Sequence, residues 1–298
     1  MNTNKRKILD PVVIAKLSGM LLKARFVVEG FITGLHHSPH KGYSLEFAQH
    51  REYSPGDELK HLDWKVYAKT DRHYIKQYQE ETNMKCYILL DKSASMGYKS
   101  NGVSKIDYAT MAAASISYLA LRQQDSVGLS IFDSGIVKHI PPRQGIQHLS
   151  VIMNELENVT ASKTTGISAA LQEMGGYVKK RGLVIVISDL FDNEEEVLKS
   201  LKHLRFKKNE IIVFHVMDKM ELKLPPGESV LFEDIETGAK VLTEPDLIRK
   251  EYEKIINNFI NNYRLSCRNS DIDYYHINTS DALDRVLGLY FAEREKLK

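Results

Sequence analysis

The sequence predicts an α/β fold built on a doubly wound, mostly parallel β-sheet. From about Lys85 onward, short apolar runs alternate with segments of helical periodicity. Two of these runs, at residues 85–91 and 183–191, are apolar at consecutive positions, as expected for strands covered on both faces. Strands of this kind that alternate with helices are typical of a doubly wound sheet.

The remaining elements follow from their own residue patterns. Segments 126–135 and 136–142 form a predicted strand pair, and two further strands are expected at 210–218 and 271–278. The segment 104–124 is apolar on nearly all sides, which indicates a helix packed on a sheet. Further helices are predicted at 145–159, 166–181, 193–208, 245–266 and from Asp281, with a hairpin around 232–242.

The first part of the chain, residues 1–82, has a different pattern. A helical start at 10–28 is followed by β-like and loop-like sequence that contains the turn-forming pair Pro55 and Gly56. We expect residues 1–82 to be an N-terminal helix-plus-β extension, packed on a sheet domain of residues 83–298.

The composition and charge of the chain exclude several classes of protein. Hydrophobic residues make up 43% and charged residues 27% of the 298, which is typical of a globular protein in water. The net charge of +2 gives no bulk attraction to nucleic acid or anionic membrane. The chain has no apolar run near the ~20 residues that a bilayer span needs, no signal-peptide core, and two cysteines without CxxC spacing. We therefore expect a cytoplasmic protein without a membrane span and without a nucleic-acid partner.

A cluster of oxygen-bearing side chains follows the strand at 85–91. Asp91, Ser93 and Ser95 stand at alternate positions, and they are hard ligands suited to Mg²⁺, with Mn²⁺ as the alternative. Thr165 precedes a helix and Asp189 ends another central strand, so all of them are expected at the edge where parallel strands end. Taken singly, the serines and aspartates could equally be helix caps or turn residues.

This pattern resembles the metal-ion-dependent adhesion site of von Willebrand factor A domains, and the resemblance runs from about residue 83 to the end. It implies that Ser93, Ser95 and Thr165 coordinate a cation, and that Asp91 does so directly or through a water. Asp189 would hold waters of the ion, and an acidic side chain of a partner would complete the coordination.

The segment "REYSPGDELKHLDW" resembles R-x-Y-x-P-G-D-x-x-x-x-I-D-W, the signature of the domain-of-unknown-function 58 family. The matching residues are Arg51, Tyr53, Pro55, Gly56, Asp57, Asp63 and Trp64. Members are von Willebrand factor A-like bacterial proteins, often encoded beside MoxR-type AAA+ ATPases. From the residues alone, Trp64 and Tyr53 are expected to anchor the extension by packing, with direct ligand contact as the alternative.

The same family carries a D-P-x-E stretch, which "DKME" resembles with Lys219 in place of the proline. The residues alone do not assign a role to Asp218 and Glu221.

These observations favour a metal-dependent protein-binding module that acts as adaptor or co-chaperone with a MoxR-type AAA+ ATPase and captures an acidic side chain of a client protein. The alternative is a metal-dependent phosphoester hydrolase. A haloacid-dehalogenase-like phosphatase would have an acid two residues after Asp91, where this chain has Ser93. No P-loop motif is present. We therefore expect no enzymatic activity; a von Willebrand A fold with a vestigial site is a third possibility.

Overall fold

The computed structural model describes residues 11–36, 50–52, 74–76, 84–100, 102–162, 166–178, 181–224, 229–233 and 238–296. The chain divides into two compact units. One comprises residues 1–34 together with 84–298, and the other comprises residues 35–83.

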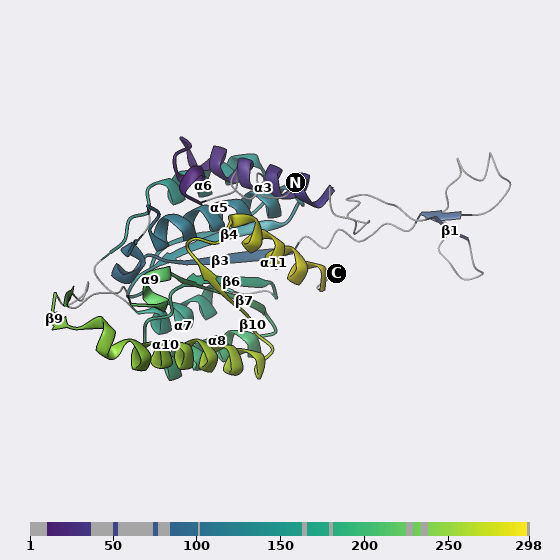
Figure 1. Cartoon of the computed structure of the whole chain (residues 1–298). Helices are drawn as coiled ribbons and strands as arrows, with labels where there is room; N and C mark the ends of the chain where they lie inside the picture. The colour runs from purple at the N-terminus through teal and green to yellow at the C-terminus, as the bar shows by residue number, and fades with distance from the viewer. Residues whose placement is uncertain are drawn as a thin grey trace. The chain divides into compact units, whose positions relative to one another are not determined.

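The larger unit is built on a mixed, mostly parallel sheet, which confirms the predicted fold class (Figure 1). Six described strands lie in the order β10-β7-β6-β3-β4-β5. Their bounds are β3 (Lys85–Asp91), β4 (Ser126–Phe132), β5 (Ile136–Arg143), β6 (Leu183–Ser188), β7 (Glu210–Met217) and β10 (Asp273–Asn278). All neighbouring pairs run parallel except β4 and β5, which the short turn between them makes antiparallel.

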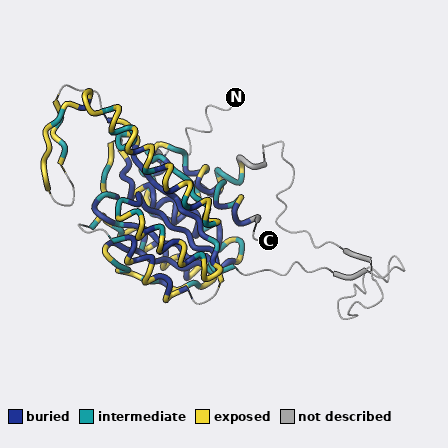
Figure 2. Tube along the Cα trace, turned by 90° about the horizontal axis from the view of Figure 1, so that it is seen from below, coloured by how far each residue is buried: buried dark blue, intermediate teal, exposed yellow. Residues whose placement is uncertain are grey.

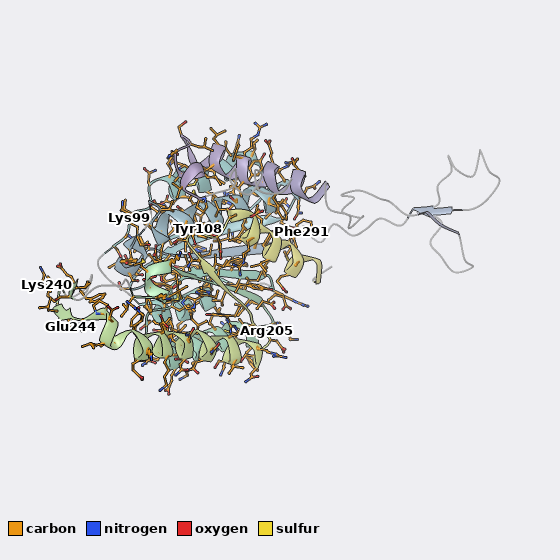
Figure 3. All side chains as sticks on the ribbon, in the orientation of Figure 1. Lys99, Tyr108, Arg205, Lys240, Glu244 and Phe291 are labelled. Carbon is orange, nitrogen blue, oxygen red and sulfur yellow. The ribbon has the colours of Figure 1, made fainter. Side chains whose placement is uncertain are left out.

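Helices cover both faces of this sheet. Those described in the larger unit include α2 (Pro11–Ala15), α3 (Met20–His36), α5 (Lys105–Arg122), α6 (Ile146–Glu157), α7 (Ile167–Tyr177), α8 (Glu194–Phe206), α10 (Pro245–Arg268) and α11 (Leu283–Lys296). Along β3, Ile88 and Leu90 belong to the core shared with α5, α6 and α11, whereas Tyr87 and Leu89 belong to the core shared with α7, α8 and α10. This alternation explains the unbroken apolar run, and the central strands β3, β4, β6 and β7 are accordingly the buried centre of the unit (Figure 2).

The helix α3 belongs to the sheet-containing unit, which differs from the predicted boundary near residue 82. Its residues Ala24, Val27 and Val28 are fully buried in the same core as α5 and α11. Their spacing puts them on one face of the helix. Burial of that face therefore joins the beginning of the chain to the sheet unit, and the separate unit starts at Leu35.

The smaller unit contains one described strand pair, β1 (His50–Glu52) with β2 (Tyr74–Lys76). The two strands are antiparallel, and Arg51 lies opposite Ile75.

Between β7 and β10 the chain forms a short helix, α9 (Lys219–Leu222), and then a hairpin of β8 (Val230–Glu233) and β9 (Lys240–Thr243). The hairpin was predicted around 232–242. It forms its own two-stranded sheet and lies on the side of the unit where the parallel strands end (Figure 1). None of the helices in the described ranges has the length and apolar character needed to cross a membrane.

One buried polar side chain, His215 of β7, gives the fold a pH dependence. It is fully buried, and its Nδ1 lies 2.5 Å from the hydroxyl oxygen of Tyr274. Burial holds the pKa of His215 well below its ordinary value, and the nearby His276 and Lys105 lower it further. The folded state therefore keeps this ring neutral.

We predict that the contribution of His215 to the free energy of unfolding falls as the pH drops below about 6.5, the ordinary histidine pKa. Below that value the unfolded chain binds a proton that the folded chain excludes, so stability rises with pH and then levels off. Urea titrations across about pH 5–8 measure this slope. His215→Asn, which can still bond Tyr274, should flatten it. The exposed-site control His203→Asn should leave it unchanged, and an unchanged slope in His215→Asn would refute this assignment.

Candidate metal centre

Asp91 is the last residue of β3 and lies at the carboxyl end of the sheet. Its side chain is almost fully buried. One carboxylate oxygen accepts a hydrogen bond from the backbone N–H of Ser93 at 2.8 Å, and the other accepts one from the hydroxyl of Ser188 at 2.6 Å. Because Ser188 ends the neighbouring strand β6, the ends of the two strands are tied together at this carboxylate.

Ser93 and Ser95 present their hydroxyls beside this carboxylate. Their Oγ atoms lie 3.1 Å apart at the start of the short 3₁₀ helix η2 (Ala94–Gly97). Ser93 occupies the N-cap position of η2, yet its side chain makes no capping hydrogen bond. The capping alternative for Ser93 is therefore wrong, and its hydroxyl oxygen retains capacity for another ligand.

Asp189 follows β6 directly and is fully buried, so both predicted aspartates lie at the ends of adjacent central strands. Its Oδ2 is 2.7 Å from the Nζ of Lys105. Burial raises the pKa of Asp91 to about 7, with the negative charge of Asp189 as the second cause. The two carboxylates thus lie close enough to repel each other.

Lys105 was missed by sequence reasoning, although it is central to this region. It is the first residue of α5, it is fully buried, and its Nζ also lies 2.5 Å from a carboxylate oxygen of Glu221. The ammonium group lies 5.1 Å from the centre of the Phe191 ring. Burial opposes its charge, but Asp189 and Glu221 outweigh that effect and raise its pKa. In the sequence, the one indication that Lys105 has a special role is its place in the helix predicted at 104–124, which is otherwise apolar on nearly all sides.

The structure answers the open question about Asp218 and Glu221. The two form a capping box on α9, in which Asp218 accepts from Met220 N–H and Glu221 accepts from Asp218 N–H at 2.7 Å. Asp218 also accepts from Ser100 beyond η2 and, at 3.2 Å, from the hydroxyl of Thr279 beyond β10. Both side chains therefore hold loops at the edge of the sheet where the oxygen cluster lies.

Thr165 lies outside the described residues, and its role stays a prediction. The segments on either side of it are placed at this edge. The N–H of Ser162 donates to the carbonyl of Lys92 at 2.7 Å. Gly166 lies so close to Ser134 that an added Cβ would come within 2.9 Å of its backbone.

Of the seven residues that match the N-terminal motif, Arg51 lies in β1 of the smaller unit. The others lie outside the described residues, and their packing or binding role stays a prediction: Tyr53, Pro55, Gly56, Asp57, Asp63 and Trp64.

The donor set consists of hard oxygens. Within the described ranges, no group of three or more His, Cys, Asp or Glu side chains is placed to hold a metal ion. An ion here would therefore depend on the hydroxyls of Ser93 and Ser95 together with Asp91. Mg²⁺ and Mn²⁺ accept such oxygens, whereas a zinc site would use histidine or cysteine.

Comparison with solved structures supports the α/β fold. The pilus adhesin SpaC from Lactobacillus rhamnosus GG aligns with a TM-score of 0.50 and 12% identity, over 82% of this chain and 34% of the adhesin. The von Willebrand factor domain of the pili tip protein Mfa5 from Porphyromonas gingivalis aligns with a TM-score of 0.39 and 8% identity, over 72% and 96% of the respective chains. At these identities the likeness concerns the fold alone.

Curated relatives come from bacteria. An uncharacterized protein of Mycobacterium tuberculosis is 25% identical over 232 residues, which are 77% of this chain and 73% of the relative. The protein YeaD of Bacillus subtilis is 26% identical over 157 residues, 52% of this chain and 37% of YeaD.

The family described as "Protein of unknown function DUF58" matches residues 49–258, which cover most of the chain, including the N-terminal motif and the strands that carry the oxygen cluster. The chain therefore belongs to the DUF58 family.

Proposed function

We propose that this protein is a metal-dependent protein-binding module whose cation, Mg²⁺ or Mn²⁺, is held by Asp91, Ser93 and Ser95. Thr165 would supply a further oxygen ligand, and Asp189 would hold waters of the ion. The observation that carries this proposal is the pair of serine hydroxyls 3.1 Å apart beside a buried carboxylate. A fold of von Willebrand factor A type fits an interaction module, which supports the same conclusion.

The charges of the region fit a divalent cation. Asp91, Asp189 and Glu221 are carboxylates, and Lys105 is the ammonium group that two of them share. Among the described residues no ion pair is formed by Asp91, and Lys92, which follows it, pairs with Asp133 instead. The buried region therefore carries more negative than positive charge, which a bound cation would offset.

The ligand set also indicates what the ion would do. Two neutral hydroxyls and one carboxylate leave a divalent ion electrophilic, and such an ion supplies a coordination position for an incoming carboxylate. Ser93 and Ser95 would orient the ion, while Ser188 and the N–H of Ser93 hold the Asp91 carboxylate in place. The partner would contribute a Glu or Asp side chain.

The partner that we propose is a MoxR-type AAA+ ATPase, with an acidic side chain of a client protein as the group captured at the metal. The chain would act as an adaptor or co-chaperone of that ATPase. The support for this step is the family resemblance of the N-terminal motif, which includes Arg51, Tyr53 and Trp64.

A phosphoester hydrolase is less well supported by the same residues. Phosphoryl transfer at such a site needs an acid or base beside the reacting oxygen. Ser93 stands where a second aspartate would act, and Lys105 is already bonded to two carboxylates. In the described part of the site, Ser93 and Lys105 therefore supply no group that is free to transfer a proton.

Ser93→Ala should abolish or strongly weaken Mn²⁺ binding, because it removes one of the oxygens that hold the ion, and it should leave the fold intact. Titration of free Mn²⁺ by electron paramagnetic resonance measures the affinity, and thermal melting in chelator measures stability. Ser115→Ala is the matched control, since Ser115 is a buried serine whose hydroxyl donates to the carbonyl of Met111 at 2.7 Å. Equal Mn²⁺ affinity in wild type, Ser93→Ala and Ser115→Ala would contradict the proposed site.

Partner capture should depend on the same oxygens. The wild-type chain, used as bait in native lysate, should recover an AAA+ ATPase in Mg²⁺ and lose it in EDTA, with mass spectrometry as the readout. Ser93→Ala should lose the ATPase in both conditions, and Ser115→Ala should behave as wild type. Recovery that is insensitive to EDTA and to Ser93→Ala would show that the ATPase binds without the metal.

A further inference from the structure

The lysine that no sequence motif indicated lies beside the proposed metal site. Lys105 is fully buried, and its Nζ is 2.7 Å from Asp189 and 2.5 Å from Glu221. These carboxylates come from the loop after β6 and from α9, so a single ammonium group joins two loops at the carboxyl end of the sheet.

We infer that Lys105 is a built-in cation that sets the affinity of the site for its divalent ion. Its positive charge cancels one unit of negative charge near Asp91. In the absence of a partner, the divalent ion is therefore bound weakly and stays electrophilic. The ion and the carboxylate of a partner then bind cooperatively. This inference rests on the proposed function, because it concerns the same site.

The electrostatic reason is direct. A fixed positive charge in a buried region repels a second cation, and the repulsion is poorly screened there. The carboxylate that a partner brings offsets this repulsion, so each ligand strengthens the binding of the other by the same factor. A purely structural lysine would instead leave metal affinity unchanged in any variant that still folds.

The test is a series of variants that changes the charge of the region one unit at a time. Lys105→Met removes the positive charge and keeps an unbranched side chain against Phe191. Glu221→Gln removes a negative charge, and glutamine can still accept in the capping box of α9. The double variant Lys105→Met/Glu221→Gln removes both and restores the wild-type net charge.

The Mn²⁺ dissociation constant, measured by electron paramagnetic resonance at about pH 8, where ordinary carboxyl groups are ionised, should follow this charge. Lys105→Met should bind Mn²⁺ at least about tenfold more tightly than wild type, and Glu221→Gln about tenfold more weakly. The double variant should bind nearly as wild type does. Lys138→Met, at the half-exposed ion pair with Glu155, should leave the affinity unchanged.

Two outcomes would overturn the inference. If wild type binds Mn²⁺ and the folded variants all bind it equally, Lys105 is structural and the proposed metal site survives. If wild type binds no Mn²⁺, the proposed function fails together with the inference. If Lys105→Met fails to fold, the Mn²⁺ affinities of Glu221→Gln and the double variant are compared instead. The inference requires the double variant to bind Mn²⁺ more tightly than Glu221→Gln, and equal affinities would overturn it.

Discussion

The edge of the sheet where the parallel strands end is organised around one buried ion-pair triad, Lys105 with Asp189 and Glu221. Taking three charges out of water is costly unless each is paired, and removal of one partner from a buried pair costs about 3–5 kcal/mol. The triad therefore fixes three elements at once: the start of α5, the end of β6 and the short helix α9. The oxygen cluster of Asp91, Ser93 and Ser95, between the end of β3 and η2, lies at the same edge of the sheet.

The remaining polar side chains at this edge have complementary roles. Asp218 binds the loop after η2 and the end of β10 through Ser100 and Thr279. Burial raises the pKa of Asp218, but these hydrogen bonds outweigh that effect and lower it. Asp192, in the loop after β6, accepts from the N–H and the hydroxyl of Ser168 at the start of α7, each at 3.1 Å. Loops from four strands are thus cross-linked around Asp91, which keeps its serine neighbours in place.

Much of the fold could be predicted from the sequence because its determinants are local. Runs such as Tyr87 to Leu90 predict strands that are covered on both faces. This run also places Asp91 at the carboxyl end of its strand. The alternate spacing of Asp91, Ser93 and Ser95 then suffices to bring their oxygens together. The hairpin of β8 and β9 also follows from local pattern.

What could not be predicted depends on contacts between residues far apart in the chain. Nothing in the pattern around Lys105 shows that it meets Asp189 and Glu221, which are 84 and 116 residues away. The assignment of α3 to the sheet unit has the same cause, since Ala24, Val27 and Val28 are buried in the same core as residues of α5 and α11. Thr165 and the motif around Trp64 lie outside the described residues, and their roles stay predictions.

The central claim is that a divalent cation is held by the serine hydroxyls beside Asp91. Anomalous diffraction from crystals grown with Mn²⁺ tests it most directly. We expect a single strong peak about 2.1 Å from the Oγ atoms of Ser93 and Ser95, with Lys105 still bonded to Asp189 and Glu221. A fully occupied Mn²⁺ bound elsewhere, with no peak beside these hydroxyls, would contradict the account.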